Sequence, residues 1–217
     1  GVASRRSSEE LIRAGRVKID GKTVTELGTK VKQGQKITLN GREIRDTHKK
    51  IYVMLNKPRG VVCTCADRYA EVKVTDIVKI DGARLFPVGR LDKDSEGLIL
   101  LTNDGDFSNK ITHPRYGLTK TYNVWTDKKI STDRIFRLIK GVCDDGEFIR
   151  AEKIIDLSDN LYIFIMKEGK KREIRRLVRQ ACANIKKLRR TAIGDLSLDK
   201  RLSAGGWRFL TEREKDS

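Results

Sequence analysis

The sequence predicts an α+β protein. Short apolar runs separated by Gly, Asn, Asp and Pro recur along most of its 217 residues, which is the pattern of β-strands joined by turns. A few segments with helical spacing and capping residues lie between them, such as residues 131–140, where Ser131 precedes the apolar stripe and Gly141 follows it. This length suits one ordinary domain together with a small one.

Residues 1–46 are expected to form the small unit. Ser7 and Glu10 match a capping box that would begin a helix, and Gly15 would end it. Residues 16–19 and 35–39 alternate like strands, and each run leads into a hairpin turn signal, first Asp-Gly and then Asn-Gly.

Residues 47–217 are expected to form the larger domain, after a polar linker over residues 46–50. The turn Asn56-Lys57-Pro58-Arg59-Gly60 follows its first strand, and a short helix begins at Asp104. The expected strands are residues 51–55, 84–88, 98–101, 120–124, 148–157 and 161–166, with 205–211 closing the domain.

The composition points to a polyanionic partner. Lysine and arginine number 47 against 30 acidic residues, a net charge of +17, and such an excess is typical of proteins that bind nucleic acid. The longest apolar run, residues 161–166, is far shorter than the about 20 residues of a membrane span. We see no signal peptide and expect a cytoplasmic protein without a membrane partner.

No metal site is expected from the cysteines and histidines. Cys63 and Cys65 form a Cys-x-Cys pair without a second pair, so reduced thiols are expected there and at Cys143 and Cys182. The two histidines are far apart in the sequence.

The most distinctive stretch is the loop over residues 89–97, where Asp92, Asp94 and Glu96 lie between two glycines and two strand-like runs. A calcium loop is one interpretation, but Asn103 stands where that motif requires a bidentate Glu. A solvated acidic turn is another. A carboxylate held on such a loop is also a natural catalytic position.

This stretch, Gly-Arg-Leu-Asp followed after four residues by Gly and an apolar run ending in Thr-x-Asp-Gly, closely resembles the catalytic motif of RsuA/RluB-type rRNA pseudouridine synthases. Those enzymes carry an S-four-type RNA-binding domain, which the segment from Gly1 to Val24 also resembles. The resemblance assigns the catalytic carboxylate to Asp92 and RNA binding to the arginines Arg5, Arg6, Arg13 and Arg16. The usual first helix of that domain is missing, so we expect a truncated N-terminus.

Further motifs extend the resemblance. Lys-x-Tyr matches Lys120 and Tyr122, and it implies that the tyrosine stacks on the target base. The phrase Gly-Lys-Lys-Arg-Glu-Ile-Arg-Arg implies that Arg175 pairs with Asp92. The same stretch carries an apolar stripe at helical spacing, Ile174, Leu177, Val178 and Ala181, which leaves its arginines on other sides of the helix.

The remaining site residues also follow from the resemblance. Leu188 would pack against the base pocket, and the expected substrate-binding residues are Arg90, Lys120, Arg172 and Arg176. The Asn-Lys-Pro-x-Gly motif at Asn56 is expected to support the catalytic loop through packing. The ending Gly-Asp-Leu-Ser-Leu-Asp-Lys-Arg is closer to RluB than to RsuA, which favours large-subunit over small-subunit rRNA.

The resemblance implies a small helix-and-hairpin module followed by a mixed, mainly antiparallel sheet. It implies a monomeric enzyme that flips a uridine out of rRNA and isomerises it without a metal or other cofactor. An Asp92 carboxylate would attack the sugar or stabilise its developing positive charge, while Arg175 favours the anion. The alternative is an RNA-binding ribosome assembly factor that keeps the fold without the chemistry.

Overall fold

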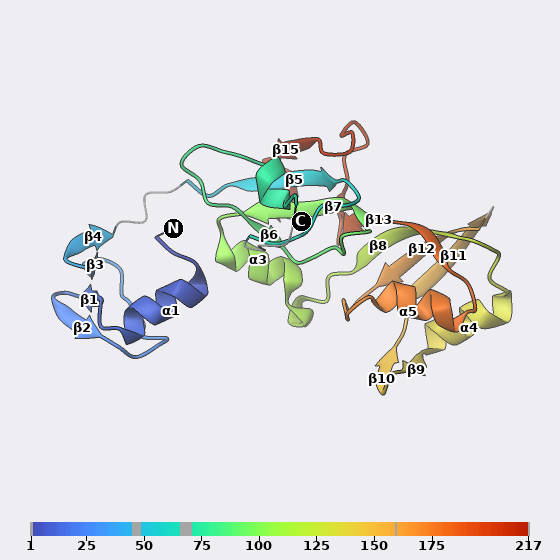
Figure 1. Ribbon diagram of the computed structural model, residues 1–217, viewed down its shortest axis with the longest axis horizontal. Coiled ribbons are helices and arrows are strands. Elements are labelled where there is room, and N and C mark those ends of the chain that lie inside the picture. Colours follow the sequence, from blue (N-terminus) through green and yellow to red (C-terminus); the bar gives the residue numbers. More distant parts are fainter. Residues whose placement is uncertain (1, 45–48, 66–70, 159, 217) are drawn as a thin grey trace. The chain divides into compact units, whose positions relative to one another are not determined.

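The computed structural model describes residues 2–44, 49–65, 71–158 and 160–216. The chain divides into two compact units, Gly1–Lys49 and Lys50–Ser217 (Figure 1). The boundary expected after residue 46, most of the expected linker and Asp159 lie outside the described residues. No helix of the described part has the length and hydropathy needed to cross a membrane.

The first unit consists of one helix and a four-stranded antiparallel sheet in the order β2-β1-β3-β4. Its elements are α1 (Arg5–Arg13), β1 (Val17–Ile19), β2 (Lys22–Val24), β3 (Ile37–Leu39) and β4 (Arg42–Ile44). Both predicted hairpin turns are present. Asp20-Gly21 and Asn40-Gly41 have positive φ at each residue, between 49° and 80°, which these residue types tolerate best.

The start of α1 differs from the prediction. The helix begins at Arg5 with Ser4 as its N-cap, and the Ser4 hydroxyl accepts a hydrogen bond from the backbone N–H of Ser7 at 3.1 Å. Ser7 is therefore inside the helix, because Ser4 already has the extended backbone and the hydroxyl that a cap needs. Gly15, with φ of 66°, follows the helix end as predicted.

A nine-stranded sheet forms the second unit, with the main order β11-β12-β8-β13-β7-β5-β15. β14 pairs with β13, and β6 pairs with β7. Neighbouring strands of this sheet are antiparallel except for β7 and β13, which confirms the mixed, mainly antiparallel architecture. The strands are β5 (Tyr52–Lys57), β6 (Phe86–Val88), β7 (Glu96–Thr102), β8 (Lys120–Thr126), β11 (Lys153–Ser158), β12 (Leu161–Met166), β13 (Ile185–Ile193), β14 (Leu196–Ser197) and β15 (Trp207–Phe209).

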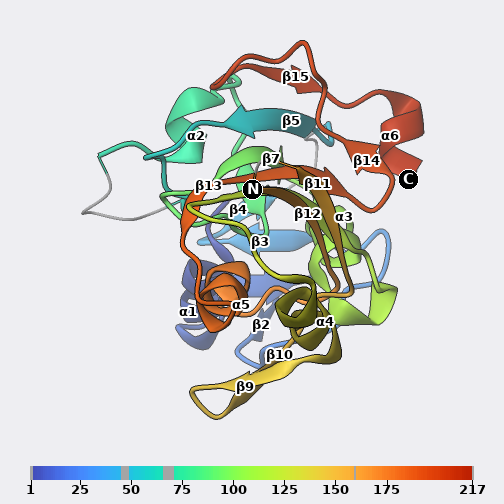
Figure 2. The ribbon, with the colours of Figure 1, turned by 90° about the vertical axis from the view of Figure 1, so that its right-hand side faces the viewer.

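Helices and one small hairpin complete this unit. α4 and α5 cover one face of the β8, β11 and β12 region, and the β9–β10 hairpin lies beyond the two helices (Figure 1, Figure 2). These elements are α2 (Val74–Ile77), α3 (Gly105–Thr112), the 3₁₀ turn η1 (Pro114–Tyr116), α4 (Thr132–Lys140), β9 (Val142–Asp144), β10 (Glu147–Ile149), α5 (Glu173–Gln180) and α6 (Glu212–Asp216).

β5 and β7 are buried on both faces, which explains why their sequences are continuous apolar runs rather than alternating ones. Val53 and Leu55 point into one apolar cluster, and Met54 between them points into another. The first cluster is covered by the chain segment that contains α2, and the second by α3 and β14. A third cluster joins β8 and β12 to α4 and α5.

The predicted apolar stripe of α5 is confirmed. Ile174, Leu177, Val178 and Ala181 are all buried in the third cluster. The basic stretch from Lys167 to Arg190 is nevertheless interrupted, because α5 ends at Gln180 and β13 begins at Ile185. The arginines of α5 therefore lie on one short helix that packs beside the central strands.

The β9–β10 hairpin was not predicted. Phe148, expected in a long strand over residues 148–157, instead lies in β10, and a turn at Asp145-Gly146 reverses the chain. The buried Asp144 carboxylate accepts hydrogen bonds from Arg176 Nε at 2.6 Å, Gln180 Nε2 at 2.6 Å and Arg179 Nη2 at 3.0 Å. These donors hold the pKa of Asp144 well below its usual range and tie the hairpin to α5.

Gly97 permits the parallel contact between β7 and β13. Its φ is +103°, and a Cβ atom there would lie 2.2 Å from the backbone oxygen of Arg190, its register partner. No other residue type fits this approach without moving one of the two strands.

Gly97→Ala should reduce the free energy of unfolding by about 2–5 kcal/mol, because it combines backbone strain with a clash against main-chain atoms. Urea unfolding, followed by a spectroscopic signal from the second unit, would measure this free energy. Gly105→Ala is the matched control, since Gly105 has no positive φ and open space around it. Equal effects of the two substitutions would contradict the argument.

Asp144→Asn should lower the free energy of unfolding at pH 7. The difference in this free energy between the variant and the wild type should become smaller as the pH falls below about 4. The folded state lowers the Asp144 pKa, so its contribution is present above the ordinary aspartate pKa of about 3.9 and is lost in acid. Urea unfolding of both proteins at pH 7 and pH 3 would test this. Asp145→Asn, at a side chain 85% exposed, is the control and should change little. A deficit that is constant with pH would contradict the assignment.

Candidate active site

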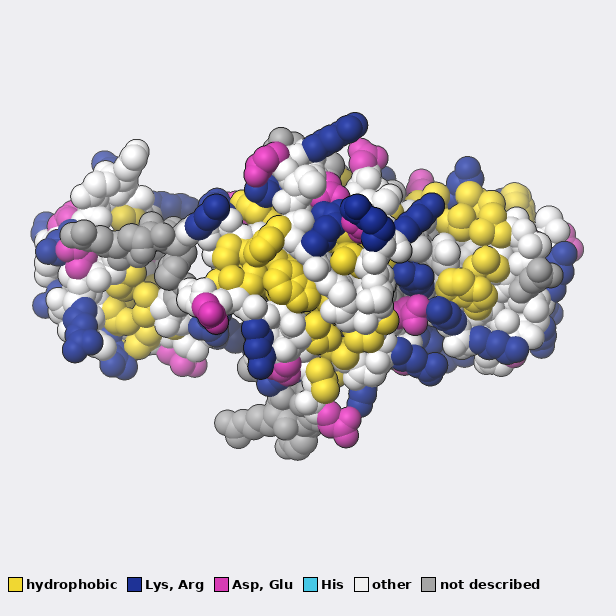
Figure 3. All heavy atoms as spheres, turned by 90° about the horizontal axis from the view of Figure 1, so that it is seen from above, with side chains coloured by type: hydrophobic (Ala, Val, Ile, Leu, Met, Phe, Trp, Pro, Cys, Tyr) yellow, Lys and Arg dark blue, Asp and Glu magenta, His cyan; other side chains and the backbone are white. Residues whose placement is uncertain are grey.

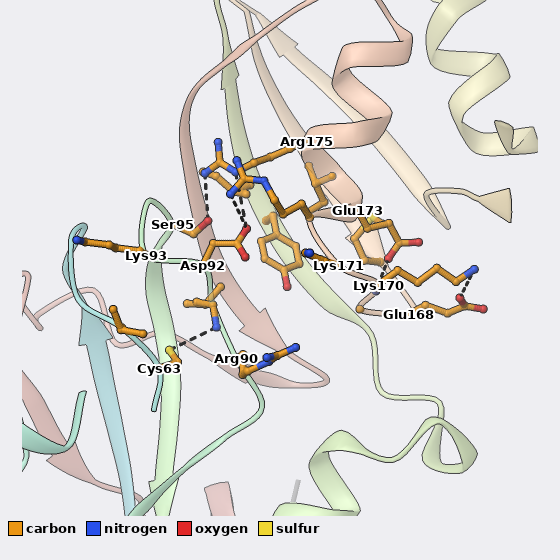
Figure 4. A pocket seen from close by; sticks show the side chains of 18 of the residues that line it. Cys63, Arg90, Asp92, Lys93, Ser95, Glu168, Lys170, Lys171, Glu173 and Arg175 are labelled. Carbon is orange, nitrogen blue, oxygen red and sulfur yellow. Dashed lines mark hydrogen bonds and ion pairs between the residues drawn. The ribbon is translucent and has the colours of Figure 1, made fainter. Parts of the chain in front are cut away.

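A cavity of about 820 Å³ lies over the loop between β6 and β7 that carries Asp92 (Figure 4). Its walls come from segments far apart in the sequence: this loop, the segment after β5, one residue of β8, the end of β12, the approach to α5 with its first turn, and one residue of β13. The lining residues that the site uses are Cys63, Arg90, Asp92, Ser95, Tyr122, Lys171, Arg172, Arg175 and Leu188.

Lys57 shapes the loop from beneath. Its side chain is fully buried, and its ammonium donates hydrogen bonds to the carbonyl oxygens of Ser95 at 2.6 Å, Pro58 at 3.0 Å and Lys93 at 3.5 Å. Burial lowers the pKa of Lys57, while the acidic groups of the loop act in the opposite direction. The motif therefore supports this loop, and hydrogen bonds from a buried cation to backbone oxygens are part of that support.

A second contact fixes the residue before Asp92. The backbone N–H of Leu91 donates to the Cys63 sulfur at 3.4 Å (Figure 4). Burial raises the pKa of this thiol, so it is a neutral acceptor in the wall of the cavity. Cys63, Cys65, Cys143 and Cys182 are all free cysteines in the structure.

Asp92 and Arg175 point toward each other across the cavity floor (Figure 4). Arg175 Nε lies 3.8 Å from Asp92 Oδ2, and Arg172 Nη1 lies 4.0 Å from the same oxygen. The carboxylate therefore faces two guanidinium groups at loose ion-pair distance. The expected pair of Asp92 and Arg175 is thus a loose one, since no hydrogen bond joins the two side chains in the described part of the chain.

Asp94 holds Arg175 more tightly than Asp92 does. Arg175 Nη2 lies 2.9 Å from Asp94 Oδ2 and also donates to the Asp94 carbonyl and the Ser95 hydroxyl, each at 3.3 Å. Its Nε is buried without a hydrogen-bond partner. Burial lowers the pKa of Arg175, and the charge of Asp94 is the largest influence that raises it. One end of the guanidinium is thus anchored, and the other faces Asp92.

Tyr122 and Leu188 reach the same cavity from neighbouring strands. Tyr122 lies on β8, opposite Phe164 of β12 and Arg190 of β13 in the strand register. Its half-buried ring packs against two apolar clusters, and Leu188 is buried beside the cavity. A flat aromatic face and an aliphatic side chain therefore border the space above the Asp92 carboxylate.

Of the eight residues that the resemblance assigns to the reaction or the substrate, six lie at this cavity, including Asp92. Arg90, Tyr122, Arg172, Arg175 and Leu188 line the cavity together with it. Arg90 is exposed at the rim.

Arg176 and Lys120 are placed elsewhere. Arg176 is occupied by Asp144 and by Glu147, whose Oε2 lies 2.5 Å from Arg176 Nη1, because one further residue along α5 turns the side chain toward the β9–β10 hairpin. The Lys120 ammonium donates to the Leu118 carbonyl at 3.0 Å, and burial lowers its pKa. Neither residue lines the Asp92 cavity, and their role in substrate binding stays a prediction.

The four arginines expected to bind RNA are exposed in the first unit. Arg5 forms an ion pair with Glu9 at 3.2 Å, and Arg16 donates to the Asn40 side chain at 2.8 Å. Arg6 and Arg13 have no ion-pair partner among the described residues and are seven positions apart on α1, which puts them on one side of the helix. Basic side chains are spread over the face shown in Figure 3, with carboxylates between them.

Sequence reasoning missed Lys57, Asp94 and Ser95 as parts of the site. The fully buried lysine has a signal in the Asn-Lys-Pro motif, but its contacts depend on a loop 36 to 38 positions away. Asp94 is one of three acids in the catalytic loop, and nothing in the sequence distinguishes it as the tighter partner of Arg175. Among the described residues no group of three His, Cys, Asp or Glu side chains could hold a metal ion.

Comparisons with known proteins agree on one family. Residues 51–180 match the model of the RNA pseudouridylate synthase family, and residues 1–37 match the S4 domain. The chain is 40% identical to ribosomal large subunit pseudouridine synthase B of Bacillus subtilis, over 99% of this chain and 89% of that protein. It is 37% identical to the dual-specificity RNA pseudouridine synthase RluF of Escherichia coli, over 99% of this chain and 73% of that one.

Solved structures give the same result. A crystal structure of a pseudouridylate synthase superposes with a TM-score of 0.74 at 29% identity, covering 98% of this chain and 93% of that one. The matched family model includes β5, the Asp92 loop, Tyr122 and α5, which together build the cavity described above. The chain therefore belongs to the RNA pseudouridylate synthase family and is an RNA pseudouridine synthase with an N-terminal S4 domain.

Proposed function

We propose that this enzyme converts a specific uridine of large-subunit rRNA to pseudouridine, with Asp92 as its catalytic carboxylate. The observation that carries the proposal is the meeting of Asp92, Arg175 and Tyr122 at one cavity, from three separate parts of the chain. The 40% identity to a synthase named for the large ribosomal subunit supports the choice of rRNA.

The reaction breaks the bond between N1 of uracil and the anomeric carbon and forms a bond from C5 to that carbon. The proton on C5 is lost and N1 gains one, so the product is an isomer and no electrons are exchanged. Positive charge develops on the sugar when the first bond breaks. A carboxylate at the cavity floor can attack that carbon or stabilise its charge, and both roles require the ionised form of Asp92.

The loose contact with Arg175 suits this task. A guanidinium at 3.8 Å attracts the charged carboxylate without occupying its oxygens in tight hydrogen bonds. Because Asp94 and Ser95 hold the other end of Arg175, its buried Nε stays directed at the catalytic carboxylate. Arg172 adds a second positive charge on the same side.

The target base has to leave its stack to enter the cavity, and this unstacking costs about a few kcal/mol of free energy. Tyr122 provides a face on which the uracil stacks, and Leu188 packs beside it. Contacts from Arg90 and from the S4 arginines Arg5, Arg6, Arg13 and Arg16 to phosphates offset this unstacking.

Asp92→Asn should lower turnover by more than about a thousandfold, equivalent to about 4 kcal/mol of transition-state stabilisation, because a neutral amide cannot supply the charge. Tritium release from rRNA labelled at C5 of uridine measures turnover, and filter binding should give an RNA affinity within about threefold of wild type. Asp81→Asn, on an exposed loop outside the cavity, is the matched control. An active Asp92→Asn enzyme would contradict the catalytic role of Asp92. If the pseudouridine that the enzyme makes were found in small-subunit rRNA, the proposed substrate would be wrong.

Tyr122→Phe and Tyr122→Ala separate the ring from its hydroxyl. If the ring mainly stacks on the base, Tyr122→Phe should retain RNA affinity and Tyr122→Ala should lose about 1–3 kcal/mol of it. If the hydroxyl instead takes part in removing the C5 proton, Tyr122→Phe should still break the bond from N1 to the sugar but should release tritium from C5 more slowly. Single-turnover tritium release and binding distinguish the two roles, and wild-type behaviour of both variants would exclude Tyr122 from the site.

A further inference from the structure

A second cavity, of about 620 Å³, adjoins the one that contains Asp92. The two cavities have three lining residues in common, Lys171, Arg172 and Arg175, so these side chains form the wall between them. The far side of the second cavity is made by Arg176 and Arg179 of α5, the β9–β10 hairpin and the start of β13.

Most charges around the second cavity are already paired. Arg176 is held by Asp144 and Glu147, and Arg179 contacts Asp144 with a side chain that is still 63% exposed. In the shared wall, Arg172 and Arg175 face Asp92 and Asp94. These pairs leave few cationic groups available to a ligand.

Lys171 is different from the rest of the wall. It is exposed, lines both cavities, and has no hydrogen-bond or ion-pair partner among the described residues. An unpaired ammonium between two cavities is a point charge suited to a phosphate oxygen. The lining of the second cavity contains no aromatic residue, so it offers the backbone of a nucleic acid a contact but no stacking face for a base.

We propose that the RNA strand passes from the first cavity to the second over this wall, and that Lys171 binds the phosphodiester at the crossing. The second cavity then holds the sugar-phosphate of the nucleotide adjoining the target uridine, with Arg179 as a further phosphate contact. The inference rests on the proposed function, because the crossing is defined by a uridine bound over Asp92. It assigns to Lys171 the positioning of the strand and no part in the chemistry.

Lys171→Gln should raise the KM for an rRNA substrate about tenfold and leave kcat within about twofold. The dependence of log affinity on log salt concentration should become shallower by about 0.7, the value for one phosphate contact to a single strand. Lys171→Arg should restore both values because it keeps the positive charge. Lys153→Gln is the matched control, since Lys153 is an exposed lysine of β11 outside both cavities.

Arg179→Gln should shift KM and the salt dependence in the same direction, and Arg179→Lys should recover most of the loss. An unchanged salt dependence and KM in Lys171→Gln would overturn the proposal, as would a fall in kcat at constant KM. The KM and kcat comparisons require that the wild-type enzyme releases tritium from the labelled rRNA. A wild type that binds rRNA without releasing tritium would instead contradict the proposed function, while its salt dependence still tests Lys171.

Discussion

One buried ammonium group determines the shape of the loop on which the chemistry depends. Lys57 has no exposed surface, and its charge is satisfied by backbone oxygens on both sides of Asp94. Removing a lysine from water is unfavourable unless such acceptors are in place, so the loop and the lysine specify each other's position. The same loop presents Asp92 to the cavity and Asp94 to Arg175. The distances in the site thus depend on a residue that does not touch the cavity.

The local elements were largely predictable. The turns at Asp20-Gly21 and Asn40-Gly41 each have positive φ at two successive residues. Asp-Gly and Asn-Gly favour this conformation, so the dipeptides alone predict the turns. The stripe from Ile174 to Ala181 predicted which side of α5 is buried. The separate motifs that carry Asp92, Tyr122 and Arg175 were specific enough to predict side chains that line one cavity. The boundaries of the two domains and the roles of the site residues stay predictions.

Other features depend on contacts that a linear pattern does not contain. Arg175 and Arg176 are adjacent and chemically identical, yet one faces Asp94 and the other faces Asp144, because a helix turns each successive residue by about 100°. Which of them meets the catalytic loop depends on the angle at which α5 packs. The β9–β10 hairpin was missed because its three-residue strands are too short to show an alternating pattern, and its charged contacts with α5 join residues about 30 positions apart.

The position of β13 in the sheet also bears on how this enzyme is made in the cell. β13 lies between β8 and β7, and it joins the half of the sheet that carries α5 to the half that carries the Asp92 loop. It is nevertheless among the last strands to be synthesised, and Ser95 and Arg175 are 80 positions apart. Non-local pairing of this kind forms slowly. The two strands that β13 joins, β7 and β8, are both made earlier, so the two parts of the sheet are connected only after residues 185–193 have been synthesised.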